Sequence, residues 1–211
     1  MNLRYIPFFI AILFLNACAG VSGHHIPDEY IALPEEAAFL VGSIGVKTAG
    51  ENESPNSFSR IDFRQRGDEK KATLVISQSL YFPSDMDYKE ADREGTVFSL
   101  VLEPGEYEIV NVSFFYNNGY VEKSYSAKED FSVPFSIEAG RVYYMGEFLA
   151  FGKYGKNIFG ITIAAGGYFV HYTNYERDLP LLLTKYPELQ DREIVQLDLE
   201  VNVPPLIYSS K

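Results

Sequence analysis

The sequence predicts a mainly β fold, an antiparallel β-sandwich of one domain with a short C-terminal helix packed on it. Runs that alternate apolar and polar residues are separated by turn signals at the spacing typical of sandwiches and barrels. The length of 211 residues suggests a single domain, and the apolar content of 46% argues against a wholly disordered chain. Most of the 16 Tyr and 16 Phe are then needed to fill the strands.

Four segments, 73–82, 96–102, 131–137 and 195–201, carry the strand pattern. Each places apolar side chains on one parity, as expected of a half-buried strand. In 131–137 the odd positions are apolar while Ser and Pro alternate with them. Pro134 has no N–H to donate, which predicts a sheet edge or a bulge there.

Two turns are expected to join strands into a meander over 98–125. Pro104-Gly105 suits the central positions of a type II turn, where Pro sets φ and Gly accepts a positive φ. Asn118-Gly119 is the usual dipeptide of a type I′ hairpin.

The segment 141–151 differs because both parities are apolar, which predicts a strand covered on both faces. A helix is available as a cover. Asp178 is a plausible N-cap, Pro180 falls in the first turn, and Pro187 stops the run. Its apolar residues recur at helical spacing: Leu179, Leu182, Leu183 and Tyr186. We expect this helix to pack near 141–151.

Composition excludes several classes of protein. The chain has 18 Lys and Arg against 29 Asp and Glu, a formal charge of −11, which argues against a general nucleic-acid binder. The single cysteine, Cys18, excludes an intrachain disulfide and any site with several cysteine ligands.

The first twenty residues have the order of a secretory signal: a charge at Arg4, an apolar run over 5–15, and small residues at 17–20. The run is too short for a membrane-spanning helix, which takes about 20 residues.

Leu15-Asn16-Ala17-Cys18 resembles the lipobox of bacterial lipoproteins. The resemblance implies that the Cys18 thiol receives a diacylglyceryl group, that cleavage occurs before it, and that its new amino group is acylated, for instance with palmitate. Removing 1–17 takes away one Arg and no acid, so the charge would become −12. An ordinary cleaved signal with an incidental cysteine, or a buried core segment, are the alternatives.

This interpretation divides the chain into a signal peptide (1–17), a lipidated N-terminus and tether (18–36), and the β-sandwich domain (37–211). Ala19 after the cysteine resembles the enteric pattern for outer-membrane sorting. The expected location is therefore the bacterial cell envelope, lipid-anchored, in the outer membrane and facing the periplasm.

Two further motifs carry a resemblance of fold. Leu102-Glu103-Pro104-Gly105-Glu106-Tyr107 resembles the L-x-P-G-x-Y turn of prealbumin-like and carboxypeptidase-regulatory-like sandwiches. The segment 135–146 resembles a strand of the DUF2846-like group of uncharacterised bacterial lipoproteins. That group implies a β-sandwich and has no agreed catalytic residues to transfer.

The acidic stretch 85–95 is the main candidate for metal chemistry. Asp85-x-Asp87 followed by more acids is similar to a calcium loop, since a hard cation takes several oxygen ligands. However, Lys89 stands at the third ligand position and Glu90 where the loop needs Gly. A solvated loop is the favoured interpretation.

Histidines and basic residues give weak signals. His24 and His25 lie in the expected tether, and His171 among aromatics is interpreted as structural rather than as a catalytic base. Arg64, Arg66, Lys70 and Lys71 are diluted by acids, which indicates a solvated turn. The segment 152–156 is not a phosphate-binding loop and is expected to be a polar hairpin connection.

These observations predict a non-catalytic binding, scaffold or accessory module of the envelope, with no catalytic, cofactor-binding or metal-binding residues. Its expected contacts are the membrane, through the lipid on Cys18, and an envelope protein partner, but no nucleic acid. The alternatives are a small-ligand or glycan-binding protein that uses its aromatics and an envelope enzyme with an acidic, metal-dependent site.

Overall fold

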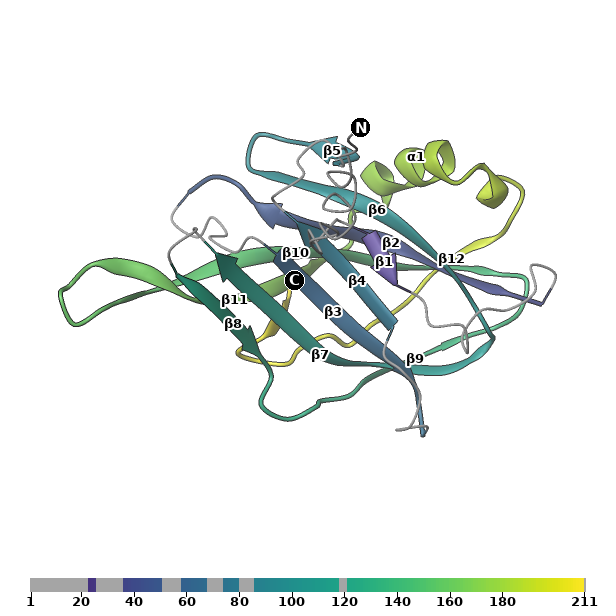
Figure 1. Ribbon diagram of the computed structural model, residues 1–211. Helices are drawn as coiled ribbons and strands as arrows, with labels where there is room; N and C mark the ends of the chain where they lie inside the picture. Colours follow the sequence, from purple (N-terminus) through teal and green to yellow (C-terminus); the bar gives the residue numbers. More distant parts are fainter. Residues whose placement is uncertain are drawn as a thin grey trace, which may run out of the picture.

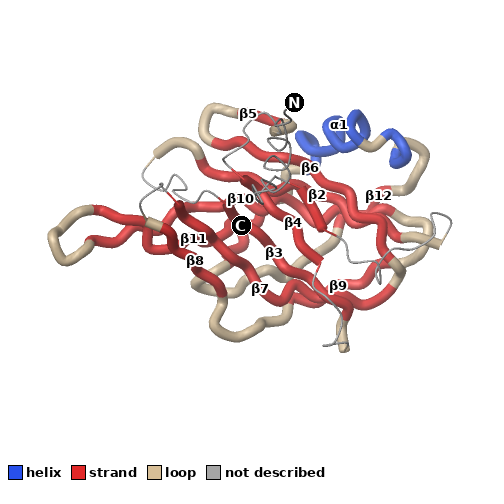
Figure 2. The backbone as a smooth tube through the Cα atoms, in the orientation of Figure 1, coloured by secondary structure: helices blue, strands red, loops and turns tan. Residues whose placement is uncertain are grey.

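The computed structural model describes residues 23–25, 36–50, 58–67, 74–79, 86–117 and 121–210, and these form the mainly β fold that the sequence predicts (Figures 1 and 2). Cys18 and the lipobox lie outside the described residues. Three residues of the expected tether form a strand, β1 (Gly23–His25), which pairs with β4 (Leu74–Ser79).

The first sheet is antiparallel, and its strands run in the order β1, β4, β3 (Phe58–Gln65), β7 (Gly105–Asn117) and β8 (Glu122–Ser126). A further strand, β9 (Val133–Ile137), also pairs with β7. Val133, Phe135 and Ile137 are buried while the residues between them are exposed, as the period-two pattern predicts.

The second sheet runs in the order β13 (Ile207–Ser209), β11 (Thr162–Tyr172), β10 (Val142–Lys156), β2 (Ala38–Lys47), β6 (Arg93–Leu102) and β5 (Tyr88–Lys89). A short strand, β12 (Ile194–Gln196), also pairs with β10. This sheet is mixed, because β10 runs parallel to β2 and to β12, and β11 runs parallel to β13. The expectation of purely antiparallel pairing was therefore wrong here.

One hydrophobic core draws its side chains from both sheets. Phe114 of β7 meets Phe169 of β11 with ring centroids 5.0 Å apart, and Phe98 of β6 belongs to the same buried cluster. Leu199 and Val201 are buried on the predicted parity, but the strand predicted over 195–201 ends early, because β12 stops at Gln196. The last strand of the chain is β13, which the sequence did not predict.

The predicted meander over 98–125 is wrong at its first turn. Strands β6 and β7 belong to different sheets, so Pro104-Gly105 forms a corner between sheets rather than a hairpin. Gly105 has a φ of +158°, far from the value of about +80° at the third position of a type II turn. The Tyr107 hydroxyl donates to the Glu103 carbonyl at 2.8 Å and fastens the corner, as tyrosine corners do.

The hairpin expected at Asn118-Gly119 agrees with the pairing of the strands on either side of it. Strands β7 and β8 do pair as antiparallel neighbours, and the last pair joins Asn117 to Glu122. The turn itself lies outside the described residues.

Strand β10 is buried on both faces over residues 142–150, as its composition predicts. Its pairing with β2 shifts register between Tyr144 and Glu147, which marks a β-bulge at Gly146. Before the bulge Tyr143 and Met145 face the core, and after it Phe148 and Ala150 do. The bulge therefore exchanges the parity that points inward.

Helix α1 (Tyr175–Lys185) covers the outer face of the second sheet, followed by the 3₁₀ turn η3 (Pro187–Leu189) (Figure 1). Leu182 forms a second buried cluster with Phe39 and Val142 of the sheet, so the predicted site of packing is confirmed. The predicted start is wrong, because Asn174 precedes the first turn and Asp178 lies inside the helix, buried against the sheet. None of the helices in the described part of the chain is long and apolar enough to cross a membrane.

Candidate binding site

The hairpin formed by β10 and β11 extends beyond the rest of the molecule, at the left of Figure 1. Large apolar side chains at its tip face solvent: Ile158 is 93% exposed, Phe159 79% and Ile161 60%. The sequence prediction of a polar connection at 152–156 was wrong, because those residues are the end of β10 and the connection that follows is apolar.

Hydrogen bonds within the tip hold these side chains outward. The Asn157 amide donates to the Ile161 carbonyl, and the Gly160 amide donates to the Asn157 carbonyl, both at 2.9 Å. The Asn157 side-chain oxygen accepts from the amides of Phe159 and Ile161 at 2.9 and 3.0 Å. Gly160 has a φ of +76°, a conformation that glycine adopts without strain.

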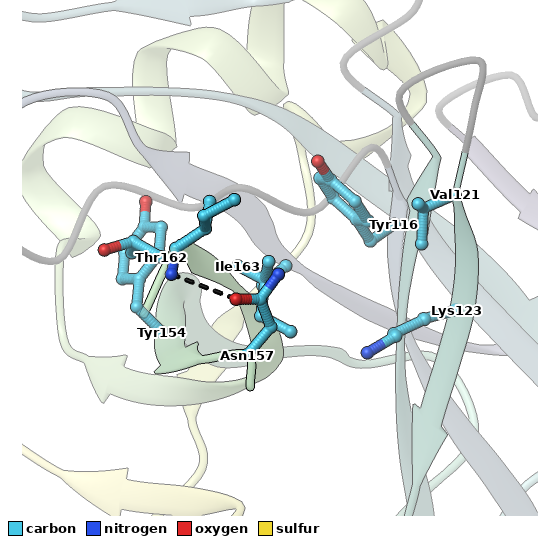
Figure 3. Close-up of a pocket in the computed structure, with 9 residues that line it drawn as sticks. Tyr116, Val121, Lys123, Tyr154, Asn157, Thr162 and Ile163 are labelled. Carbon is cyan, nitrogen blue, oxygen red and sulfur yellow. Dashed lines mark hydrogen bonds between the residues drawn. The ribbon is translucent and has the colours of Figure 1, made fainter. Parts of the chain in front are cut away.

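A groove of about 490 Å³ lies between this hairpin and the end of the β7–β8 hairpin (Figure 3). Tyr116 and Lys123 stand on one side of it, and Asn157 and Ile163 on the other. Its lining combines aromatic, aliphatic and polar side chains: Tyr116, Val121, Lys123, Tyr154, Asn157, Ile161, Thr162, Ile163 and Ala164.

The base of the groove is held by contacts between the two hairpins. The Tyr125 hydroxyl of β8 donates to the Ala164 carbonyl of β11 at 3.0 Å. Gly166 lies against the Tyr125 ring, and a Cβ there would sit 3.5 Å from it. The groove is therefore a feature of the packed fold, with side walls from both sheets.

The charge of this region differs from that of the chain. The segment 148–175 has no Asp or Glu but carries Lys153 and Lys156, in a protein of formal charge −11. Lys123 adds a third cation across the groove. Clustered positive charge of this kind attracts anionic groups.

The lining of the groove has the chemical character of a binding surface. Among the described residues, its titratable lining residues are Lys123, Tyr116 and Tyr154, and the lining holds no His, Cys, Asp or Glu. Tyrosines and branched aliphatic side chains instead offer large contact areas, and Asn157, Thr162 and Lys123 add polar groups for orientation.

The acidic stretch 85–95 forms ion pairs rather than an open cage of oxygens. Asp87 binds the Lys185 ammonium at 2.6 Å, Glu94 pairs with Lys89, and Asp92 pairs with Lys47. Within the described residues, no group of three or more His, Cys, Asp or Glu is placed to hold a metal ion. The pairs engage carboxylates that the calcium interpretation would need, and Asp85 lies outside the described residues.

The histidines and the basic cluster have separate positions. His171 is buried, and its Nε2 donates to the Met145 carbonyl at 2.7 Å; burial lowers the pKa of its ring. This is a structural contact beside the β10 bulge. His24 and His25 fall on β1, where their side chains are not described. Arg64 pairs with Glu108 and Asp130, and Lys70 and Lys71 lie outside the described residues.

The sequence analysis missed a buried charged cluster between the second sheet and helix α1. Glu147 of β10 and Asp178 of α1 are both 0% exposed. Glu147 receives hydrogen bonds from Arg93, Arg177 and the Tyr88 hydroxyl, at 3.0, 2.8 and 2.7 Å. A fourth comes from the Asn174 side chain. We call these residues, with Tyr144 and Ser43, the Glu147 cluster.

Asp178 is the second carboxylate of the Glu147 cluster. It accepts from the Ser43 and Tyr144 hydroxyls at 2.6 and 2.7 Å and from Arg177 at 2.8 Å. Burial raises the pKa of Asp178 and these bonds oppose the rise, whereas burial beside two carboxylates raises the pKa of Tyr88 and Tyr144.

Ion pairs join the charged side chains of the Glu147 cluster. Arg93 and Arg177 meet the two buried carboxylates and also pair with the more exposed Glu90 and Asp92. Arg177 stacks on the Tyr88 ring as well, 3.8 Å from its centroid. These paired groups fasten α1 to the sheet. A single acid beside glycine in an apolar run, Gly146-Glu147, is the only signal for this site in the sequence.

Comparison with known proteins yields no match: no protein-family model, curated protein or solved structure resembles this chain. The groove and the hairpin tip are therefore the features of the molecule that bear on its function.

Proposed function

We propose that the protein is a lipid-anchored component of the bacterial envelope that acts as a non-catalytic binding module on a prealbumin-like β-sandwich. The signal and lipobox residues support the anchor and a location at the outer membrane, facing the periplasm. Two sheets around one core and the tyrosine corner at Tyr107 support the finer description of the fold.

The observation that carries the binding role is the groove beside the exposed hairpin. Charged groups of the Glu147 cluster are satisfied inside the chain, whereas Ile158, Phe159 and Ile161 are left to solvent. Contiguous exposed apolar surface on a folded domain marks an interaction site. The groove has the mixed lining of such a site, so we assign it to an envelope partner.

Labelling with radioactive palmitate tests the anchor. Cys18→Ala removes the only thiol, so the variant should take up no label and should stay uncleaved, while Ala19→Asp should still be labelled but move towards the inner membrane. Unchanged label on the Cys18→Ala protein would refute the anchor.

Photocrosslinking in cells tests the binding surface. A photoreactive amino acid at Tyr154 in the groove should yield an adduct of defined mass with another envelope protein. The matched control is Ala139, an exposed residue in the turn before β10, at the other end of that strand. Equal adducts from both positions, or none from Tyr154, would contradict the proposed surface.

A small-ligand or glycan-binding role is the second candidate. The volume of about 490 Å³ falls in the range of small-molecule pockets, and Tyr116 and Tyr154 could stack on a sugar. A glycan array would support this role if a saturable signal is lost in Tyr116→Ala, and a blank array would count against it. The ion pairs of the acidic stretch favour neither calcium binding nor an enzyme.

A further inference from the structure

We propose that the tip of the β10–β11 hairpin, residues 157–161, inserts into the surface of an anionic lipid bilayer. This contact goes beyond the proposed function, because it assigns the apolar tip to lipid, leaves the concave groove to the envelope partner, and does not require Cys18.

The shape of the tip is that of a wedge. It is the end of a two-stranded projection (Figure 1), and Ile158, Phe159 and Ile161 are the most exposed large apolar residues described. A convex apolar end fits between lipid headgroups, whereas a ligand would occupy the concave groove behind it. A few apolar side chains at one end are also enough to bind an interface without spanning it.

Four of the five backbone amides of the tip donate hydrogen bonds within it. They are the amides of Asn157, Phe159, Gly160 and Ile161. An unpaired amide in hydrocarbon costs several kcal/mol, so irregular backbone rarely enters lipid without such pairing. Asn157 accepts two of these bonds through its side chain, and it thereby reduces the penalty of immersion.

Charge selects the kind of bilayer. Lys156 immediately precedes the tip, and Lys153 lies three residues before Lys156 on β10. Both belong to the segment 148–175, which contains no Asp or Glu. The rest of the chain is strongly acidic and would be repelled by anionic lipid, so this hairpin is the end that such a surface attracts.

An environment-sensitive fluorophore on the tip tests the insertion. The full chain carrying Cys18→Ala and Phe159→Cys has one thiol, which is labelled with NBD and mixed with vesicles. With phosphatidylcholine and phosphatidylglycerol together, the emission should shift to the blue and brighten. With phosphatidylcholine alone it should not. The matched control replaces Ala139 by Cys instead, and its emission should stay unchanged.

Charge and apolar variants measure the two components separately. Lys153→Gln and Lys156→Gln should each weaken partition onto the anionic vesicles about fivefold. Ile158→Ser should weaken it further while leaving the thermal unfolding midpoint unchanged. These effects would support the assignment.

Four results would overturn it. They are no blue shift at position 159 with anionic vesicles, an equal shift with neutral vesicles, an equal shift at position 139, and a shift that grows with protein concentration when no vesicles are present. The last result would assign the tip to a second copy of the chain. None of the four bears on the palmitate label at Cys18, so this proposal can fail without the proposed function.

Discussion

The two ends of strand β10 reverse the usual arrangement of a globular protein. Near its start Glu147 is 0% exposed and lies among charges, whereas just beyond its end Ile158 is 93% exposed. Glu147 and Asp178 have hydrogen-bond partners within the chain, whereas the large apolar side chains of the tip are exposed to solvent. The contrast separates a polar group that serves the fold from apolar groups whose partner is outside the chain.

The inner end depends on geometry that a β-bulge supplies. Gly146 shifts the register so that Tyr144 and Glu147 both face helix α1, where Arg177 and Asp178 meet them. If the strand continued with regular alternation through Gly146, Glu147 would face the hydrophobic core between the sheets. The bulge and the Glu147 cluster therefore form one structural unit.

The largest expected effect comes from breaking this unit. Glu147→Ala should lower the free energy of unfolding by about 3–5 kcal/mol, because the carboxylate accepts four hydrogen bonds and its removal leaves several buried donors, the Tyr88 hydroxyl among them, without an acceptor. Urea unfolding measures it. Glu138→Ala removes an exposed ion pair with Arg141 and should cost about 0–1 kcal/mol. Similar losses in the two variants would mean that the buried pairs contribute no more than the exposed one.

Alanine at Gly146 should have the next largest effect, a loss of about 1–3 kcal/mol. The residue has a φ of +92°, and a Cβ there would lie 2.4 Å from the His171 Nε2 and 2.7 Å from the Tyr172 carbonyl. Gly155, near the other end of the strand, is the control, because its Cβ would meet only Ala165 at 3.3 Å. If Gly155→Ala lowered the thermal midpoint as much as Gly146→Ala does, the bulge at Gly146 would be no more restrictive than the other end of the strand.

A smaller effect should appear with pH. Burial lowers the pKa of His171 in the folded protein, and the nearby Glu147 carboxylate partly opposes this shift. The unfolded chain then takes up its proton first as pH falls. Stability should be complete above the unfolded pKa of about 6.5 and decline as pH falls towards the folded pKa.

The variant His171→Gln keeps a donor for the Met145 carbonyl and cannot titrate. The difference in thermal midpoint between pH 7 and pH 5 should therefore be smaller in this variant than in the original protein. An identical acid response in both proteins would show that His171 does not contribute to it.

The sequence predicts local features of this fold better than its long-range ones. Alternation identified the buried faces at Val133–Ile137 and Phe98–Leu102, because burial on one side of a strand repeats every two residues. The parallel pairing of β10 with β2 could not be found this way, since parity does not encode strand direction. The turn at Pro104-Gly105 was predicted to be a hairpin because Pro-Gly occurs both in hairpin turns and in corners between sheets.

The two ends of β10 differ in how far their role can be predicted from the sequence. The Glu147 cluster joins residues from five separate segments of the chain, so no window of sequence contains it. The tip is contiguous, and Ile158-Phe159-Gly160-Ile161 is visible in the sequence as an apolar run. Its exposure was missed because apolar runs are ordinarily taken as core.

Urea unfolding of the double variant Ile158→Ser/Phe159→Ser tests most directly whether the tip is free of the fold. These side chains are exposed in the folded protein, so their replacement should change the free energy of unfolding by less than about 0.5 kcal/mol. A loss of about 2 kcal/mol or more would show that the tip packs within the chain and would contradict the assignment of this end of β10 to an outside partner.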